Sequence, residues 1–271
     1  MPHLLHTFES MPIDLRHYLS GDSRVSVIKE KTRASVYLIE QENAIYLKIT
    51  PKGELHHEAE MTRYLSGCGV CAKVLLYVQD DQHDYLVTEQ VKGKNAAEEE
   101  YLEQPERLCE AFAESLVRLH TIGAEDCPRD NRLQIMVERA IGNFRDGKAD
   151  RSLLRYVGYE SRDEAYKELL LLEEHAESDD RVIIHGDYCL PNLILNEFEF
   201  SGYVDVGYGG SGDRHYDLFW ALWSLQFNLK SSRYSERFID AYGRDKVDED
   251  LLRLCGIVSV FNGFRGQDYY D

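Results

Sequence analysis

The stretch His185-Gly-Asp-Tyr-Cys-Leu-Pro-Asn192 gathers several polar side chains that are typical of catalytic sites. It follows directly after the apolar residues 182–184, which predict a short strand that leads into a loop. Asp187 and Asn192 lie five positions apart on this loop and can project toward a shared point. There, a carboxylate can accept a hydroxyl proton and an amide oxygen can bind a cation. The stretch therefore predicts a catalytic loop at the end of a strand.

A second acidic motif, Asp205-Val-Gly207, ends the next predicted hairpin, whose strands are residues 192–196 and 201–206. Mg²⁺ takes hard oxygen ligands and usually keeps several waters and phosphate oxygens, so a further carboxylate supplies the charge that the metal needs. An Asp, an Asn five positions later and a downstream Asp-x-Gly also match the spacing of the protein-kinase catalytic loop. The two motifs together indicate phosphoryl transfer.

The first third of the chain has the pattern of a small antiparallel sheet with one helix. Short runs rich in Val, Ile and Tyr alternate with charged turns, which is typical of a meander. The expected strands are residues 24–30, 34–40, 44–50, 73–79 and 85–89. Residues 54–66 change to helical spacing and are followed by Gly67 and Gly69, which are helix stop signals.

Residues 92–103 form the clearest break in composition, because they are polar and include the acidic run 98–100. They are interpreted either as a tether or as the solvated start of a helix. Beyond them the pattern is mostly helical. The expected helices start at Pro105 and cover residues 165–176, 216–228, 232–242 and 247–260. The sequence thus predicts an α/β (α+β) protein with an N-terminal lobe at 1–91, a linker at 92–104 and a larger C-terminal lobe at 105–271.

The composition limits the classes of partner. The chain has 31 Lys and Arg against 49 Asp and Glu, which gives a net charge of −18. Such a surface repels nucleic acid and attracts a cationic small molecule. No apolar stretch approaches the ~20 residues that cross a bilayer. The start of the chain lacks a basic segment followed by an apolar one, so we expect a cytoplasmic protein.

Candidates for nucleotide binding lie in the first third. Lys48 lies inside the apolar run 45–49, where a lysine either extends to solvent from an edge or faces a phosphate. Glu58, on the following helix, is its expected ion-pair partner, and Glu60 is the rival that points to another side of the helix. The turn Lys31-Thr-Arg-Ala-Ser35 lies where a phosphate-covering loop is expected; it lacks glycine, but Thr32 and the loop amides can contact phosphate oxygens.

These motifs together resemble the bacterial aminoglycoside 3′-phosphotransferases, which have a bilobal, protein-kinase-like fold. The resemblance covers nearly the whole chain. The matching stretches are His185-Gly-Asp-Tyr-Cys-Leu-Pro-Asn192, Ser201-Gly-Tyr-Val-Asp-Val-Gly207, Asp213-Arg-His-Tyr-Asp217, Tyr46-Leu-Lys48, the Glu58 helix and Thr88-Glu89. The resemblance implies transfer of the γ-phosphate of ATP, or of GTP, to a hydroxyl group of an aminoglycoside of the kanamycin and neomycin class, and hence antibiotic resistance.

The resemblance also implies roles for the residues of the two acidic motifs. Asp187 would be the catalytic base, and Asn192 and Asp205 would bind Mg²⁺. His185 would be structural, and Asp217 would brace the catalytic loop.

In the first third, the resemblance implies a nucleotide site. Lys48, oriented by Glu58, would bind the phosphates. Tyr46 would stack on the base, and the backbone from Thr88 to Gln90 would hydrogen-bond it.

The expected acceptor site departs from the pattern of this family. Tyr208 follows the Asp-x-Gly motif where those enzymes usually carry Arg, and residues 152–156 carry a cation, Arg155, where their drug-binding loop is acidic. Their acidic pair near the C-terminus is also absent from residues 258–261. Glu160 and Asp163, together with Tyr208, are the candidates for acceptor binding. A kinase of the same fold that acts on an amino alcohol, a sugar amine or a macrolide is therefore the alternative.

Two other classes of protein fit parts of the pattern. A nucleotide-binding protein without catalysis would keep the fold, and a metal-dependent hydrolase would use His185, Asp187 and Asp205. The glycine-rich stretch 207–212 matches the dinucleotide fingerprint, but the predicted βαβ setting is missing. We interpret these glycines as a flexible segment after the metal site.

Overall fold

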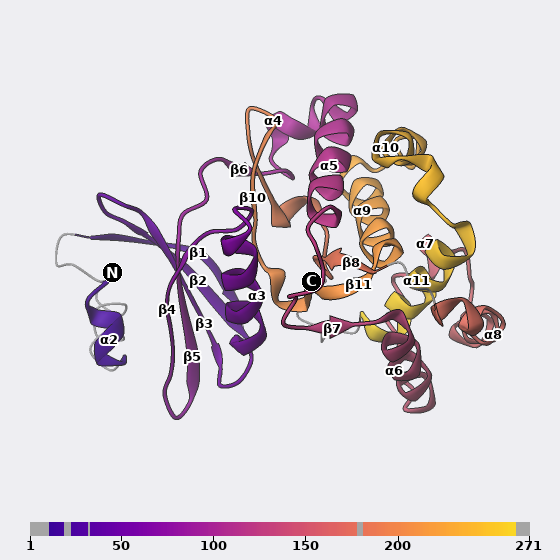
Figure 1. Ribbon diagram of the computed structural model, residues 1–271, viewed down its shortest axis with the longest axis horizontal. Helices are drawn as coiled ribbons and strands as arrows, with labels where there is room; N and C mark the ends of the chain where they lie inside the picture. Colours follow the sequence, from indigo (N-terminus) through magenta and orange to yellow (C-terminus); the bar gives the residue numbers. More distant parts are fainter. Residues whose placement is uncertain (1–10, 19–22, 32, 178–180, 264–271) are drawn as a thin grey trace. The chain divides into compact units, whose positions relative to one another are not determined.

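The computed structural model describes residues 11–18, 23–31, 33–177 and 181–263. The chain divides into two compact units, Met1–Val91 and Lys92–Asp271. Among the described residues, no helix has both the length and the apolar character that a membrane span requires. The predicted mixed fold is confirmed: a small antiparallel sheet with helices precedes a mostly helical region (Figure 1).

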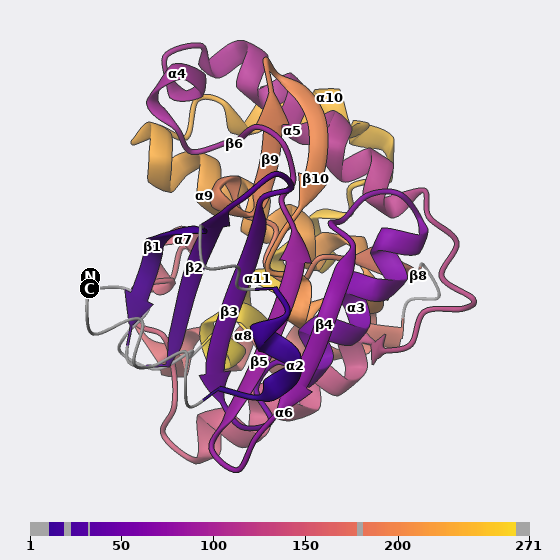
Figure 2. The ribbon, with the colours of Figure 1, turned by 90° about the vertical axis from the view of Figure 1, so that its left-hand side faces the viewer.

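The first unit is built on a five-stranded antiparallel sheet with the strand order β1-β2-β3-β5-β4 (Figure 2). Its strands are β1 (Arg24–Lys31), β2 (Ala34–Glu40), β3 (Ile45–Pro51), β4 (Val74–Gln79) and β5 (His83–Glu89). Helix α3 (His56–Gly67) connects β3 to β4, and the short helix α2 (Ile13–Arg16) precedes the sheet. The predicted strands and helix are confirmed, with bounds that move by one or two residues.

Alternating side chains on β5 build a core on each face of this sheet. Tyr85 and Val87 belong to the cluster that contains Leu15 of α2. Leu86, between them, packs instead with Leu55 and Ala59 at the start of α3. The two helices therefore cover opposite faces of the sheet, as Figures 1 and 2 show, and this packing holds α3 against the strands.

The second unit is mostly helical, with two small sheets. Its helices are α4 (Glu99–Leu102), α5 (Pro105–His120), α6 (Leu133–Arg145), α7 (Leu154–Val157), α8 (Arg162–Leu172), α9 (Arg214–Leu229), α10 (Ser235–Tyr242) and α11 (Glu249–Asn262). Its strands are β6 (Lys94–Asn95), β7 (Asp130–Asn131), β8 (Arg181–Ile184), β9 (Leu193–Asn196), β10 (Glu199–Tyr203) and β11 (Gly210–Asp213). A hydrophobic cluster of this unit includes α11, whose residues 254–261 are all buried.

Residues 92–104, suggested by the sequence as a linker, are part of this second unit. They form β6, which pairs with β9, and α4. Tyr101 of α4 is buried, and its hydroxyl donates to the carbonyl of Leu195 at 2.9 Å.

The glycine-rich stretch 207–212 is not a flexible segment, and that interpretation was wrong. Its second half is β11, which pairs with β8 on one side and with β7 on the other. A Cβ atom at Gly210 would lie 3.0 Å from the carbonyl oxygen of Arg129, and one at Gly212 would lie 2.8 Å from that of Asn131. Gly210 and Gly212 are needed because neighbouring backbone approaches too closely for a side chain.

Candidate active site

A buried carboxylate holds the loop that follows β8, residues 185–192. Asp217 of α9 is fully buried, and its two oxygens accept hydrogen bonds from successive backbone N–H groups. The His185 N–H donates to one oxygen at 2.6 Å, and the Gly186 N–H donates to the other at 2.8 Å. Bonds to a charged acceptor are among the strongest in proteins, so the start of the loop is fixed next to Asp187.

Helices α9 and α5 hold the middle of the loop. The Leu190 N–H donates to the Ser224 hydroxyl at 2.9 Å. Tyr188 stacks on Phe112 and donates its hydroxyl to the Phe112 carbonyl at 2.7 Å. Burial raises the pKa of the Tyr188 hydroxyl well above its usual value, so this group remains a donor.

The two ends of the loop are tied to each other. The Asn192 side-chain nitrogen donates to the Asp187 carbonyl at 2.9 Å, and the Cys189 thiol donates to the Asp187 carboxylate at 3.4 Å. Because the nitrogen of the Asn192 amide faces the loop backbone, its oxygen is turned away from it. Asp187 and Asn192 are both partly exposed, so each can reach a ligand.

Hydrogen bonds to Val204 bring the second acidic motif beside this loop. The Val204 N–H donates to the Asn192 carbonyl at 3.0 Å, and the His185 Nε2 atom donates to the Val204 carbonyl at 3.0 Å. Asp205 follows directly, in the left-handed region with φ 59° and ψ 39°. The structure thus brings the backbone of the 185–192 loop next to that of Asp205, and the His185 side chain joins the two motifs.

The donor set at this place suits Mg²⁺. Asp205 carries a carboxylate next to the loop in the chain's fold, and the amide oxygen of Asn192 is turned away from the loop backbone. No group of three or more His, Cys, Asp and Glu residues able to hold a metal occurs in the part of the chain that the structure describes. A sparse set of hard oxygen ligands is what Mg²⁺ uses when phosphates and waters complete its octahedron, whereas a zinc site would require several His or Cys ligands.

Gly186 is required where the two motifs meet. Its φ is +75°, and a Cβ atom there would lie 2.1 Å from the carbonyl oxygen of Tyr208. We expect Gly186→Ala to lower the free energy of unfolding by about 2–5 kcal/mol, the sum of left-handed strain and overpacking. Thermal and urea unfolding measure this loss.

Gly158 is the matched control, because its φ is +79° and nothing lies within 4 Å of a Cβ atom. Gly158→Ala should cost only the strain, about 1–2 kcal/mol. Equal losses for the two variants would contradict the close contact between Gly186 and Tyr208.

In the first unit, Lys48 and Glu58 form the predicted ion pair. The Lys48 Nζ atom lies 2.9 Å from Oε1 and 2.7 Å from Oε2 of Glu58. Their side chains are only 18% and 13% exposed, so the lysine does not extend to solvent. Glu60 is 40% exposed and lies near His57 instead. Of the two acids, Glu58 is therefore the ion-pair partner of Lys48.

Two other predicted nucleotide-binding residues lie on neighbouring strands of the same sheet. Tyr46 of β3 is paired in register with Thr88 of β5, and both are half-buried. The Gln90 N–H donates to the Ala44 carbonyl at 3.1 Å, so this donor is already used within the sheet. Thr32 lies outside the described residues. The roles of these residues in base and phosphate binding stay predictions.

Comparisons with known proteins agree with this geometry. The sequence profile of a family described as the phosphotransferase enzyme family matches residues 24–255. A probable aminoglycoside 3′-phosphotransferase of Lactococcus lactis subsp. lactis (strain IL1403) is 35% identical over 258 residues, which are 93% of this chain and 95% of the relative. The chain belongs to the phosphotransferase enzyme family.

Two further relatives support the same family. An aminoglycoside 3′-phosphotransferase of Niallia circulans is 33% identical over 216 residues, covering 77% of this chain and 80% of the relative. A crystal structure of an aminoglycoside 3′-phosphotransferase of type VIII has 28% identity and a TM-score of 0.72. It covers 92% of this phosphotransferase and 96% of its own chain. The resemblance and the protein-kinase-like fold expected from the motifs are confirmed.

The residues predicted for the acceptor site of this phosphotransferase are dispersed. Tyr208 is 49% exposed and directly follows the 205–207 motif. Glu160 and Asp163 are exposed at the start of α8, where acidic residues also favour the helix dipole. The structure places Asp163 on α8, which packs against α11 and α6, and Glu160 just before Ser161, the N-cap of this helix. Their role in acceptor binding stays a prediction.

Sequence reasoning missed two side chains that support the loop of this phosphotransferase. They are Ser224, which accepts from Leu190, and His120, which contacts Asp217 from α5. His120 continues the apolar stripe of α5 at a spacing of four residues from Leu116. The feature of the sequence that pointed to His120 was a titratable residue at a position of the helix face expected to be buried.

Proposed function

We propose that this protein transfers the γ-phosphate of ATP or GTP to a hydroxyl group of an aminoglycoside, at the 3′-position, and thereby gives resistance to antibiotics of the kanamycin and neomycin class. The observation that carries the proposal is the joined arrangement of Asp187, Asn192 and Asp205 through Val204. The names of the relatives that are 35% and 33% identical support the choice of acceptor.

Asp187 is the catalytic base in this proposal. Its carboxylate accepts or orients the proton of the acceptor hydroxyl, and the Cys189 thiol at 3.4 Å limits the rotation of the carboxylate. The backbone of the loop holds Asp187 at a fixed place, since Asn192 and Asp217 both bind that backbone. Such positioning is the main contribution a protein makes to phosphoryl transfer.

Asn192 and Asp205 would hold Mg²⁺, which neutralises charge on the phosphate oxygens when it is bound. Lys48, oriented by Glu58, would bind the nucleotide phosphates, and Thr32 would contact them as well. Tyr46 would stack on the base, and the backbone from Thr88 to Gln90 would hydrogen-bond it through groups other than the Gln90 N–H, which donates to Ala44. Each of these roles is assigned from the position of the residue in the motif that it matches.

The acceptor is proposed to be a cationic small molecule. The net charge of −18 attracts ammonium groups over a long range, and Glu160, Asp163 and Tyr208 are the candidate contacts. A kinase of another small alcohol is the second candidate function. It is favoured by the exposed cations Arg151, before α7, and Arg155, within α7, and by Tyr208.

An acceptor screen separates these two functions. ATP consumption is measured with kanamycin, neomycin, choline and a macrolide, each with Mg²⁺ and with no acceptor as the blank. We expect kcat/KM to be highest for kanamycin or neomycin. A neomycin-class compound that lacks the 3′-hydroxyl should not be a substrate. Higher kcat/KM for choline or the macrolide would replace the proposed acceptor by the second candidate.

A further inference from the structure

We propose that His120 is a positioning residue of the catalytic loop: it holds Asp217 in place, and Tyr242 and Arg214 keep His120 in the form that donates to Asp217. The proposal rests on the proposed function, because it concerns the activity of the same loop. It extends the site to helix α10, whose residues contact neither substrate nor metal in the scheme above.

The first link joins α5 to the base of the loop. His120 lies in the last turn of α5, and its side chain is 2% exposed. Its Nε2 atom is 3.3 Å from Oδ2 of Asp217. The same oxygen accepts the His185 N–H, and the other oxygen accepts the Gly186 N–H. Asp217 therefore connects His120 to the two residues that precede Asp187.

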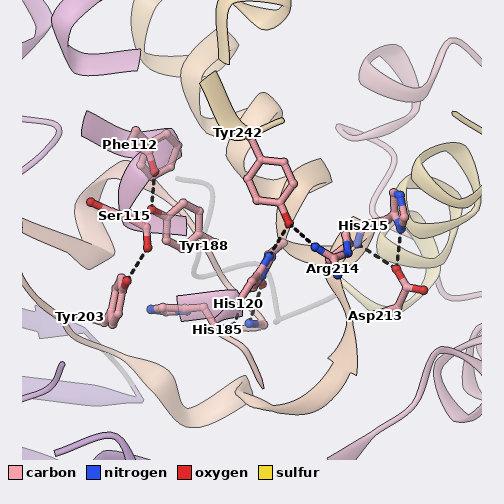
Figure 3. A network of polar contacts seen from close by, with 12 residues as sticks. Phe112, Ser115, His120, His185, Tyr188, Tyr203, Asp213, Arg214, His215 and Tyr242 are labelled. Carbon is pink, nitrogen blue, oxygen red and sulfur yellow. Dashed lines mark hydrogen bonds and ion pairs between the residues drawn. The ribbon is translucent and has the colours of Figure 1, made fainter. Parts of the chain in front are cut away.

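The second link determines which ring nitrogen of His120 carries the proton. Arg214 Nη1 lies 3.1 Å from the Tyr242 hydroxyl, and this hydroxyl lies 2.7 Å from Nδ1 of His120 (Figure 3). A guanidinium only donates, so the Tyr242 oxygen accepts from Arg214 and its O–H donates to Nδ1. The imidazole proton is then on Nε2, the atom that faces Asp217. Each residue thus donates a hydrogen bond to the next, from Arg214 through Tyr242 and His120 to Asp217.

This direction matters because Asp217 is a fully buried carboxylate. A buried charge is stable only when donors satisfy it, and His120 supplies a side-chain donor from an element other than the loop. Without His120, we expect the carboxylate to move toward a new donor or toward water. The N–H groups of His185 and Gly186 would move with it, and Asp187 is the next residue.

His215 provides a matched comparison. It is also buried and paired with a buried aspartate, since its Nδ1 atom donates to Asp213 at 2.7 Å. Its Nε2 atom accepts the Asp248 N–H at 2.8 Å, which connects the start of α9 to the start of α11. His120 and His215 are thus two buried His–Asp pairs in one unit, of which His120 contacts the carboxylate that braces the loop.

The experiment compares His120→Leu, His120→Gln and His215→Leu in the full chain. Steady-state kcat, the KM for ATP and the thermal midpoint are measured, together with amide hydrogen exchange of the 185–187 segment. We expect His120→Leu to lower kcat by about 10- to 100-fold, because a displacement of about 1 Å can cost that much. The KM for ATP should stay within about threefold, since the change affects orientation rather than binding.

The other two variants decide between positioning and simple packing. His120→Gln keeps an N–H donor near the place of Nε2, so it should recover most of kcat. His215→Leu should lower the thermal midpoint but keep kcat within about threefold. Exchange at the 185–187 amides should rise in His120→Leu only. A kcat of His120→Leu within about threefold of the wild type, or an equal fall in His215→Leu, would overturn the proposal.

Tyr242→Phe covers the case in which His120→Leu does not fold, because it removes only one hydroxyl group. We expect its kcat to fall by about 3- to 10-fold with an unchanged KM for ATP, and an unchanged kcat would overturn the proposal. The amide exchange is independent of the acceptor. An inactive wild type would contradict the proposed function, whereas equal 185–187 exchange in His120→Leu and the wild type would contradict the role of His120.

Discussion

Asp187→Asn is expected to lower kcat by about 10³-fold, within the range that general acid–base catalysis contributes. Asn has nearly the same shape as Asp, but its amide cannot accept the proton of the acceptor hydroxyl. The backbone of the loop should be unchanged, because the Asn192 side chain and the Asp217 carboxylate hold backbone groups rather than the Asp187 side chain. Single-turnover and steady-state assays with ATP and kanamycin measure the loss.

The control for this variant is nucleotide binding. Calorimetric titration with ADP and Mg²⁺ should give the same affinity as the wild type to within about threefold, since Asp187 acts on the acceptor. The thermal midpoint should also change little. If Asp187→Asn kept kcat within about tenfold of the wild type, the assignment of the base would be wrong.

Asp205→Asn is expected to lower kcat/KM by about 10²- to 10³-fold at low Mg²⁺, because a metal ligand supplies several kcal/mol of charge stabilisation. Asn is the most informative substitution here. Asp205 has a φ of 59°, and Asn tolerates the left-handed region better than most residues with a side chain, so the backbone is preserved. The rate is measured as a function of Mg²⁺ concentration, and the concentration at half-maximal rate should rise.

Glu199→Gln is a matched control, because Glu199 is an exposed acid on the hairpin that leads to Asp205. It removes the same charge and should leave the Mg²⁺ dependence unchanged. An unaltered Mg²⁺ dependence in Asp205→Asn, or an equal shift in Glu199→Gln, would mean that general electrostatics and not coordination determines the rate.

The chemistry of the site could be predicted from the sequence because it is local. Asp187 and Asn192 lie on one loop, and Asp205 follows on the next hairpin, so their order along the chain almost determines their proximity. The Lys48–Glu58 pair was also predictable, because a charged residue inside an apolar strand needs a partner and the next helix offers one. The strands of the first unit followed from their alternating Val, Ile and Tyr residues.

Strand β11 and His120 support the site through contacts between distant segments, and this is why the sequence did not predict them. Strand β11 has the sequence Gly-Ser-Gly-Asp, which has no strand propensity, and it forms because β7 and β8 lie on either side of it. His120 is 97 residues from Asp217 in sequence, and nothing in the spacing of either residue indicates the other. Contacts between distant elements of this kind depend on tertiary packing rather than on a pattern within one segment.

The most direct measurement of the central claim is transfer of a radiolabelled γ-phosphate from ATP to kanamycin, followed by separation of the product. The account predicts that the wild type labels kanamycin in the presence of Mg²⁺ and that Asp187→Asn, at the same concentration and equally folded, does not. Label that stays in ATP or appears as free phosphate with the wild type, or equal labelling by both proteins, would contradict it.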